Sequence, residues 1–367
     1  LASNSAEAKL MADLLAAAIN ETFSTLSYDA ALAGAGFAAQ ATQSGVTLEF
    51  SGYHTALLPL IDAVMARLPI PLIDEGTWTR LATLKSQELA ALDSTRPFNR
   101  LFDELTAGLM PLAYPKTELK VAMADIDRTV FHQYQQAFFS GLKAEIFLHG
   151  PISIDEGSAL VEAIASALPL DADSTDVVPG TAPWTQARDL TFSYPHPDEA
   201  AVVAFVDSDD SASSRILNQL AGNLIEAPFY TALRTERQLG YITFATAFPL
   251  VNTPILAGAI QSPVAGPQAL VDAMRGEFDA FAEQVAIMPA AQFDAAKKSL
   301  INELYNPPQT QAELSSAIWQ AIGLMRPFND RVVQAMTLEQ LTQEQFVDYL
   351  KQRLQNPIVL QASRQGG

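Results

Sequence analysis

Arg234 and Tyr241 are the two side chains whose types and spacing best suit chemistry on a peptide. A helical pattern ends near Arg234 and a strand pattern opens at Tyr241, and Gly240 between them permits the tight or left-handed backbone that such a junction needs. A guanidinium offers forked donors to a carbonyl or a terminal carboxylate. A phenol can donate to a carbonyl oxygen as negative charge develops on it. A plainer interpretation also stays open, namely an exposed cation at a helix end and a half-buried strand tyrosine.

The histidines of the chain do not form a metal site. They are His54, His132, His149 and His196. Catalytic zinc needs three protein ligands and an open position, and two ligands on one helix must lie three or four residues apart to share a face. No two histidines come that close. His196 and Glu199 are spaced as in an inverted zinc motif, but Ala200 stands where the second histidine belongs, and flanking prolines exclude a helix there. We therefore expect no metal ligand in this chain.

Composition excludes several classes of protein. The formal net charge is −19 and the lysines and arginines are scattered, which argues against nucleic acid and anionic membrane surfaces as partners. The chain has 0 cysteines, so disulfides, cysteine-ligated zinc and thiol catalysis are ruled out. No apolar run approaches the length that would span a membrane.

The sequence contains one succession of elements twice. The first copy is expected to have a helix, a turn segment, two strands and a helix, at about 5–22, 23–34, 35–40, 46–53 and 55–68. The second copy is expected to have the same elements at about 212–225, 229–240, 241–247, 255–261 and 267–285. At a constant shift, Phe23 falls on Phe229 and Gly34 on Gly240.

The remainder of each copy agrees as well. Four helical stretches and a strand follow, at 75–94, 97–111, 117–125, 127–140 and 144–149 in the first copy. The second copy has them at 289–305, 309–325, 329–336, 343–354 and 357–361. Each copy is therefore predicted to be an α+β domain, with an antiparallel sheet of hairpin-connected strands and long helices on one face.

The predicted domains are 1–168 and 188–367, joined by a linker at 169–187 that is rich in Asp, Ser, Gly and Pro. The second domain opens with two strands, at 189–194 and 200–206, that have no counterpart in the first. A sheet without its leading strands has open edges. Since the chain also begins without Met, we expect an N-terminally truncated piece of a longer protein, or strands lent by a missing half.

Several segments resemble the insulinase/pitrilysin family of zinc metallopeptidases, the family of insulin-degrading enzyme. The stretch from Arg234 to Tyr241, RTERQLGY, resembles the signature of the family's last domain. Tyr28–Gly34, Ser51–Tyr53 and Leu148–Gly150 resemble its third domain, in the right order. The resemblance covers nearly the whole chain.

The resemblance implies four similar α+β domains in a full-length protein, arranged as two bowls that close around an unfolded peptide. Zinc is held in the first domain, so this chain would be the zinc-free C-terminal half, forming the chamber wall opposite the zinc and unable to hydrolyse peptides alone. By the same resemblance, Arg234 and Tyr241 contact the substrate, and Tyr241 adds a transition-state contact. No catalytic residue proper is expected in this chain.

The expected partners are a peptide or unfolded polypeptide and the missing N-terminal half, with a homo-oligomer also possible. The resemblance to bacterial relatives suggests a periplasmic or secreted protein, and the cytoplasm is the alternative. A second function stays open: a natural zinc-free subunit that pairs with a catalytic one, as in processing peptidases. The reading frame upstream of Leu1 would distinguish the two.

Overall fold

The computed structural model describes residues 4–68, 73–171 and 180–364. Contacts divide the chain into two units. Unit 1 comprises Leu1–Leu92 and Leu112–Pro179, and unit 2 comprises Asp93–Pro111 and Gly180–Gly367. Much of the predicted linker, at 172–179, lies outside the described residues. The domain boundaries inferred from the repeat rest on sequence similarity, whereas the two units are defined by contacts between residues. The two divisions measure different properties, so the predicted boundaries remain a prediction.

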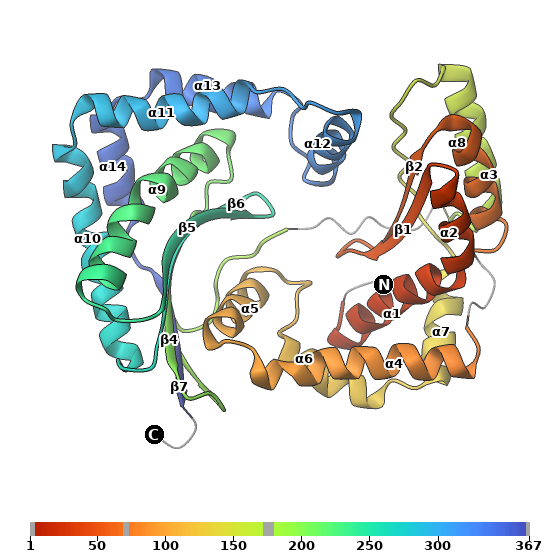
Figure 1. The fold of residues 1–367 in the computed structure, drawn as a ribbon, viewed down its shortest axis with the longest axis horizontal. Helices are drawn as coiled ribbons and strands as arrows, with labels where there is room; N and C mark the ends of the chain where they lie inside the picture. Colours follow the sequence, from red (N-terminus) through yellow and green to blue (C-terminus); the bar gives the residue numbers. More distant parts are fainter. Residues whose placement is uncertain (1–3, 69–72, 172–179, 365–367) are drawn as a thin grey trace. The chain divides into compact units, whose positions relative to one another are not determined.

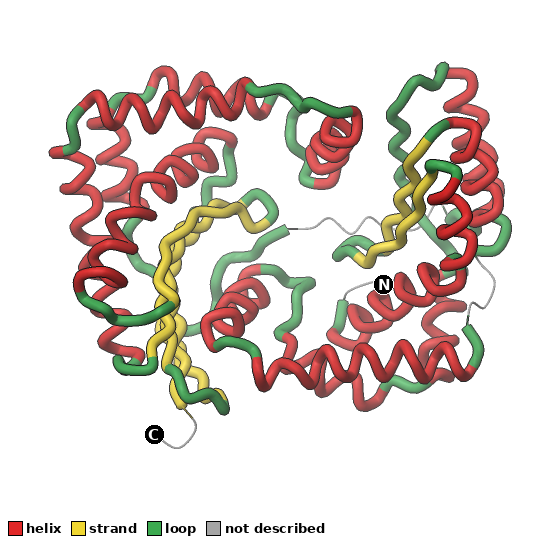
Figure 2. The backbone as a smooth tube through the Cα atoms, viewed as in Figure 1, coloured by secondary structure: helices red, strands yellow, loops and turns green. Residues whose placement is uncertain are grey.

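The described residues of unit 2 form one five-stranded sheet in the order β3-β7-β4-β6-β5. The strands are β3 (Asp189–Tyr194), β4 (Glu199–Val206), β5 (Ile242–Leu250), β6 (Thr253–Ser262) and β7 (Ile358–Arg364). Neighbours run antiparallel except β3 and β7, which are parallel. Figure 2 shows these strands as one twisted, curved sheet. Strand β5 is therefore an edge of the sheet.

Both faces of this sheet are covered. Strand β4 shows why: Ala201, Val203 and Phe205 lie in one apolar cluster with the helices that follow in the chain. The alternate residues Val202 and Ala204 lie in a second cluster on the opposite face. A strand buried on both faces is a continuous apolar run instead of an alternating one, and every residue of β6 is buried for the same reason.

Long helices cover the first face, as the sequence predicted. They are α9 (Ala212–Tyr230), α10 (Pro267–Ile287) and α14 (Gln343–Arg353). Helices α11 (Ala290–Tyr305) and α13 (Asp330–Gln340) pack against α9, and α12 (Gln311–Gly323) lies between α11 and α13 in the chain. Phe229 of α9 and Phe278 of α10 pack ring to ring at 5.5 Å in the core between helices and sheet.

One helix from the preceding part of the chain covers the second face. Helix α5 (Pro97–Leu109) places Leu101, Leu105 and Leu109, one per turn, against strands β4, β6 and β7. Figure 1 shows α5 on the side of the sheet opposite α9 and α10. The internal repeat places α5 in the first copy. The predicted sheet of the second copy has helices on one face only, so a helix on its second face was not expected. Leucines spaced four residues apart identify an apolar helix face, but they do not indicate which sheet that face covers.

Unit 1 is mainly helical. Its helices are α1 (Ala6–Thr22), α2 (Ser24–Leu32), α3 (His54–Met65), α4 (Glu75–Ala90), α6 (Lys116–Ala122), α7 (Arg128–Phe138) and α8 (Ile154–Ala167), with 3-10 turns at Ala91–Ser94 and Met123–Asp125. Strands β1 (Ala35–Ala41) and β2 (Val46–Gly52) pair as an antiparallel hairpin. Leu10, Leu15, Ile19 and Phe131 are fully or almost fully buried in its core. Within the described ranges, no helix is long and apolar enough to cross a membrane.

The strand predicted at 144–149 does not form. Its counterpart in the second copy is β7, which lies between β3 and β4 and takes its hydrogen bonds from them. Among the described residues of the first copy, no strands correspond to β3 and β4, so this segment has no ladder to join, and an isolated bridge between Leu142 and Leu170 lies nearby. The strand expected at 144–149 is therefore wrong, and the expected truncation of the first copy remains a prediction.

A buried arginine ties helix α14 to the sheet. Arg353 is 7% exposed, and its Nη2 donates to the carbonyl oxygens of Phe205 at 2.6 Å and Pro254 at 3.0 Å. Its Nε lies 3.5 Å from a carboxylate oxygen of Asp207. The two carbonyls lie at the ends of β4 and β6, so one buried cation binds both strands at this end of the sheet, together with the backbone N–H of Asp207 that also donates to Pro254.

Arg353→Met should therefore destabilise the chain by about 3–5 kcal/mol, because the change removes the cation beside the Asp207 carboxylate and the hydrogen bonds to the carbonyls of Phe205 and Pro254. Urea unfolding of the isolated chain, followed by circular dichroism, measures this. The matched control is Arg275→Met, which removes an exposed pair with Asp189 at 3.5 Å and should cost at most about 1 kcal/mol. Equal losses in both variants would contradict the assignment.

Candidate functional site

The predicted junction between helix and strand is built from a π-helical turn. Helix α9 continues into Thr231–Glu236, where the N–H of Arg237 donates to Ala232 five residues back, at 3.1 Å. Pro228, inside the end of α9, has no N–H to contribute to regular helical bonding. Turns of this kind occur frequently at functional sites. The turn carries Arg234, so this residue lies at a helix end, as predicted.

Gly240 is needed for close packing. Of the two backbone roles expected for Gly240, tight or left-handed, the left-handed one falls to Gln238, whose φ is +51°. A Cβ atom on Gly240 would lie 2.8 Å from Ile260 Cγ2 and closer still to the carbonyl oxygen of Gln261. The missing side chain therefore lets the junction lie directly on β6, which determines where Tyr241 emerges.

A second glycine holds the helix close to the strand. A Cβ atom on Gly222 of α9 would lie 2.5 Å from the Cβ of Ala247 in β5. Because neither element can move away without opening a gap in the core, α9 and β5 keep a set separation. The two elements that flank the junction are thus positioned relative to each other by packing.

Tyr241 takes part in a closed hydrogen-bond network with Asp198 and Gln261. Its hydroxyl donates to Asp198 Oδ2 at 2.6 Å. Gln261 Nε2 donates to the same carboxylate oxygen at 2.9 Å and to the Tyr241 hydroxyl at 2.6 Å. Asp198 and Gln261 are buried, whereas Tyr241 is 48% exposed. The hydroxyl of Tyr241 is therefore held by two buried side chains, while about half of the tyrosine remains accessible to solvent.

The network changes the acidity of both ionisable groups. Burial alone would raise the pKa of Asp198, but the hydrogen bonds from Tyr241 and Gln261, with His196 and Arg364 nearby, outweigh it and lower that pKa. Burial, the hydrogen bond to Asp198 and the charge of that carboxylate raise the pKa of Tyr241, against smaller opposing effects of Gln261 and Arg96. At neutral pH the network therefore holds a carboxylate and a neutral phenol.

His196 helps to orient the carboxylate. It lies in the loop between β3 and β4, as predicted, and its Nδ1 accepts a hydrogen bond from the backbone N–H of Asp198 at 3.0 Å. A nitrogen used in this way is not available to a metal. Across residues 4–68, 73–171 and 180–364, no three histidine, aspartate or glutamate side chains converge so that they could hold a metal ion.

Arg234 is partly buried, and within the described part of the chain its guanidinium makes no hydrogen bond or ion pair. The structure thus places both predicted residues on one junction, although no direct hydrogen bond joins them. Sequence reasoning missed Asp198 and Gln261. A signal for Gln261 existed, because a glutamine in an otherwise apolar strand must find polar partners.

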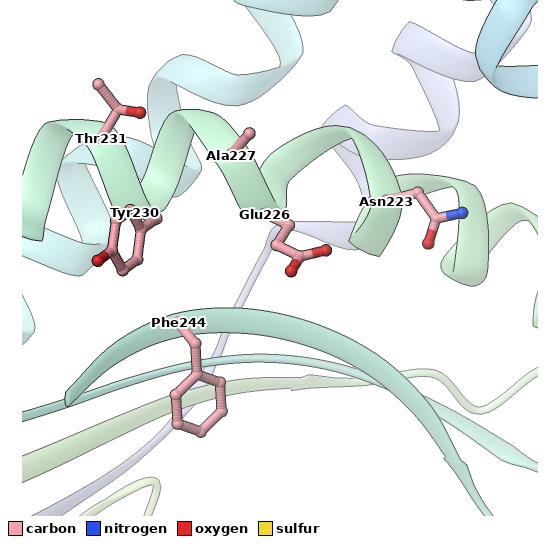
Figure 3. A pocket seen from close by; sticks show the side chains of 6 residues that line it. All are labelled: Asn223, Glu226, Ala227, Tyr230, Thr231 and Phe244. Atoms are coloured by element: carbon pink, nitrogen blue, oxygen red, sulfur yellow. The ribbon is translucent and has the colours of Figure 1, made fainter.

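A cavity of about 320 Å³ lies beside the junction. Its lining residues come from one side of α9, from the start of the π-helical turn and from β5: Asn223, Glu226, Ala227, Tyr230, Thr231 and Phe244. In Figure 3, Glu226 and Tyr230 extend from the helix toward the strand, and the ring of Phe244 points away from it. Thr231 of this lining is also the first residue of the π-helical turn that carries Arg234, so the cavity ends where that turn begins.

Comparisons with known proteins find relatives for both ends of the chain. Residues 1–121 match the family model for the middle or third domain of peptidase M16, and residues 220–319 match that for the C-terminal lobe domain 4 of PQQ synthase PqqF-like proteins. Insulin-degrading enzyme of Homo sapiens is 22% identical over 354 residues, covering 94% of this chain and 35% of the relative. Protease 3 of Escherichia coli K12 is 22% identical over 358 residues, covering 90% of this chain and 35% of the relative. The chain thus spans about a third of these relatives.

Solved structures share the fold. Pitrilysin matches with a TM-score of 0.84 and 20% identity, over 99% of this chain and 40% of its own. The inactive domain of a peptidase M16 from Pseudomonas fluorescens matches with a TM-score of 0.72 and 14% identity, over 99% of this chain and 89% of its own. The periplasmic protease PqqL of Escherichia coli matches with a TM-score of 0.68 and 15% identity, over 98% of this chain and 42% of its own. With a third-domain match at one end and a fourth-domain match at the other, the chain belongs to the insulinase family of peptidases, M16, and corresponds to the C-terminal half of its members.

Proposed function

We propose that this chain is the non-catalytic half of a zinc-dependent endopeptidase, forming the wall of the substrate chamber opposite the zinc domain. The observation that carries the proposal is the junction itself. Arg234, whose guanidinium has no hydrogen bond or ion pair among the described residues, and the accessible, anchored phenol of Tyr241 both lie on the junction between α9 and the edge strand β5, and a cavity lies between that helix and that strand. These groups suit the backbone of an extended peptide, which offers carbonyls and N–H groups in a regular row.

The zinc ion belongs to the N-terminal half in this proposal. The described residues of this chain do not fit a metal, since no suitable group of ligands converges and His196 already uses Nδ1 as an acceptor. The chain's own contribution is then binding. Arg234 donates to a peptide carbonyl, Tyr241 contacts the peptide close by, and the cavity accepts a neighbouring side chain.

A second candidate is a naturally separate, zinc-free subunit that pairs with a catalytic one. The match to the Pseudomonas fluorescens inactive domain favours it, because that chain is covered over 89% of its own length. The sequence upstream of Leu1 distinguishes the two candidates. A continuous reading frame with two more such domains would support the first, and a start codon or signal sequence shortly before Leu1 would support the second.

We propose a periplasmic or secreted location, on the basis of the match to PqqL, which is described as a periplasmic protease. The cytoplasm is the alternative. The partners in this proposal are a peptide or unfolded polypeptide and the N-terminal half, and a homo-oligomer is a further possibility. The net charge of −19 and the scattered basic residues argue against nucleic acid.

The chain alone should not hydrolyse an unfolded peptide, and hydrolysis should appear when it is joined to the N-terminal half from its own reading frame. Mass spectrometry of a peptide mixture measures both. Chelation of the metal should abolish the reconstituted activity, because the zinc and its water do the chemistry. The proposal fails if the joined protein cleaves nothing, or if the isolated chain cleaves peptides in the presence of chelator.

In the joined protein, Arg234→Ala should lower kcat/KM about 10- to 100-fold, mainly through KM, because one charge-assisted hydrogen bond to the peptide is lost. Arg234→Lys should recover little of this, since an ammonium cannot present a planar fork. Steady-state kinetics on one fluorogenic peptide measures both variants. The matched control is Arg237→Ala, which removes an exposed cation three residues away and should leave kcat/KM unchanged. Equal effects of the two alanine variants would indicate general electrostatics instead of a contact.

A further inference from the structure

The hydrogen-bond network determines which way the Tyr241 hydroxyl can act. A phenol has one hydrogen to donate and two lone pairs that accept. The hydrogen goes to Asp198 at 2.6 Å, and one lone pair accepts from Gln261 at 2.6 Å. What remains on the exposed side of the hydroxyl is a lone pair, which can only accept a hydrogen bond.

The direction of these bonds follows from the chemistry of the partners. An ionised carboxylate is an acceptor only, so both Tyr241 and Gln261 must donate to Asp198. The amide of Gln261 cannot be turned around, because its oxygen would then face the carboxylate oxygen. Arg364 and His196 lie near the carboxylate and favour its charged form, while Arg96 lies near the phenol.

We propose that Asp198 and Gln261 are positioning residues that hold Tyr241 as a hydrogen-bond acceptor for a peptide N–H of the substrate. This inference rests on the proposed function and reverses the role expected for Tyr241, which was donation to the carbonyl oxygen. Arg234, which has donors only, then binds carbonyls, and Tyr241 binds an N–H. Together the two side chains recognise both polar groups of a peptide backbone. Donation of the phenolic hydrogen to a carboxylate also strengthens the hydroxyl oxygen as an acceptor.

The network can be tested in the isolated chain, without any activity. Absorbance at 295 nm is titrated for the wild type and for Asp198→Ala, each compared with the same protein carrying Tyr241→Phe, so that the difference reports Tyr241 alone. Loss of Asp198 removes the hydrogen bond and the negative charge that hold the phenol neutral, so the pKa of Tyr241 should fall toward its ordinary value. An unchanged titration would overturn the proposed network.

The role of the network is tested in the joined protein. Asp198→Ala frees the phenolic hydrogen to point outward. If Tyr241 acts as an acceptor, Asp198→Ala and Tyr241→Phe should each lower kcat/KM about tenfold, mainly through KM, and the double variant should be no worse than either. If Asp198→Ala retains or raises kcat while Tyr241→Phe lowers it, the phenol acts as a donor and the inference is wrong.

Two further variants serve as controls. Asp198→Asn keeps an oxygen that can accept the phenolic hydrogen, so it should lie between the wild type and Asp198→Ala in kcat/KM, also if the alanine variant folds poorly. Tyr305→Phe removes another phenol–carboxylate hydrogen bond, at 3.1 Å to Glu339, and should leave kinetics unchanged. If the joined protein cleaves no peptide, the proposed function fails while the titration still decides the network. If it cleaves peptides and the kinetic pattern differs, only this inference fails.

Discussion

Gln261 is a glutamine in a strand in which every residue is buried, and the hydrogen bonds of its amide nitrogen organise one end of the sheet, while its amide oxygen has no partner among the described residues. Its Nε2 donates to the carboxylate of Asp198 and to the hydroxyl of Tyr241. Its backbone lies so close to Gly240 that no side chain fits between them. Because an unsatisfied buried amide costs roughly 1–3 kcal/mol, the loop that carries Asp198 and the junction that carries Tyr241 must both meet at this point.

The arrangement separates rigidity from accessibility. The buried members, Asp198 and Gln261, lie on the sheet and its adjoining loop, where packing leaves little freedom. Tyr241 contacts these buried residues but is itself about half exposed, and Arg234 lies on a π-helical turn. Sites built on rigid elements hold their side chains more accurately than sites on loops. A peptide-binding surface that contributes no metal still needs accurately placed side chains. A misplaced contact shifts the bound peptide away from the orientation in which it can react.

Much of the fold could be predicted from local patterns. The repeat placed most helices and strands within a few residues, since apolar spacing reports the period of each element directly. It failed at 144–149, where an apolar segment with the right character lacks neighbouring strands. It also did not find the partner of α5, whose leucines cover the second face of the sheet in unit 2. A strand and an amphipathic helix both need a partner, and the partner is a property of the whole chain.

The sequence by itself determined the family, the double α+β architecture and the junction between Arg234 and Tyr241, because these depend on motifs and on spacing along the chain. Only the tertiary structure decided what Tyr241 can do. Asp198 and Gln261 are 43 and 20 residues away from it in the sequence, yet they hold its hydrogen and one of its lone pairs. The direction of a hydrogen bond depends on which groups surround it, and pairing between distant strands brings those groups together.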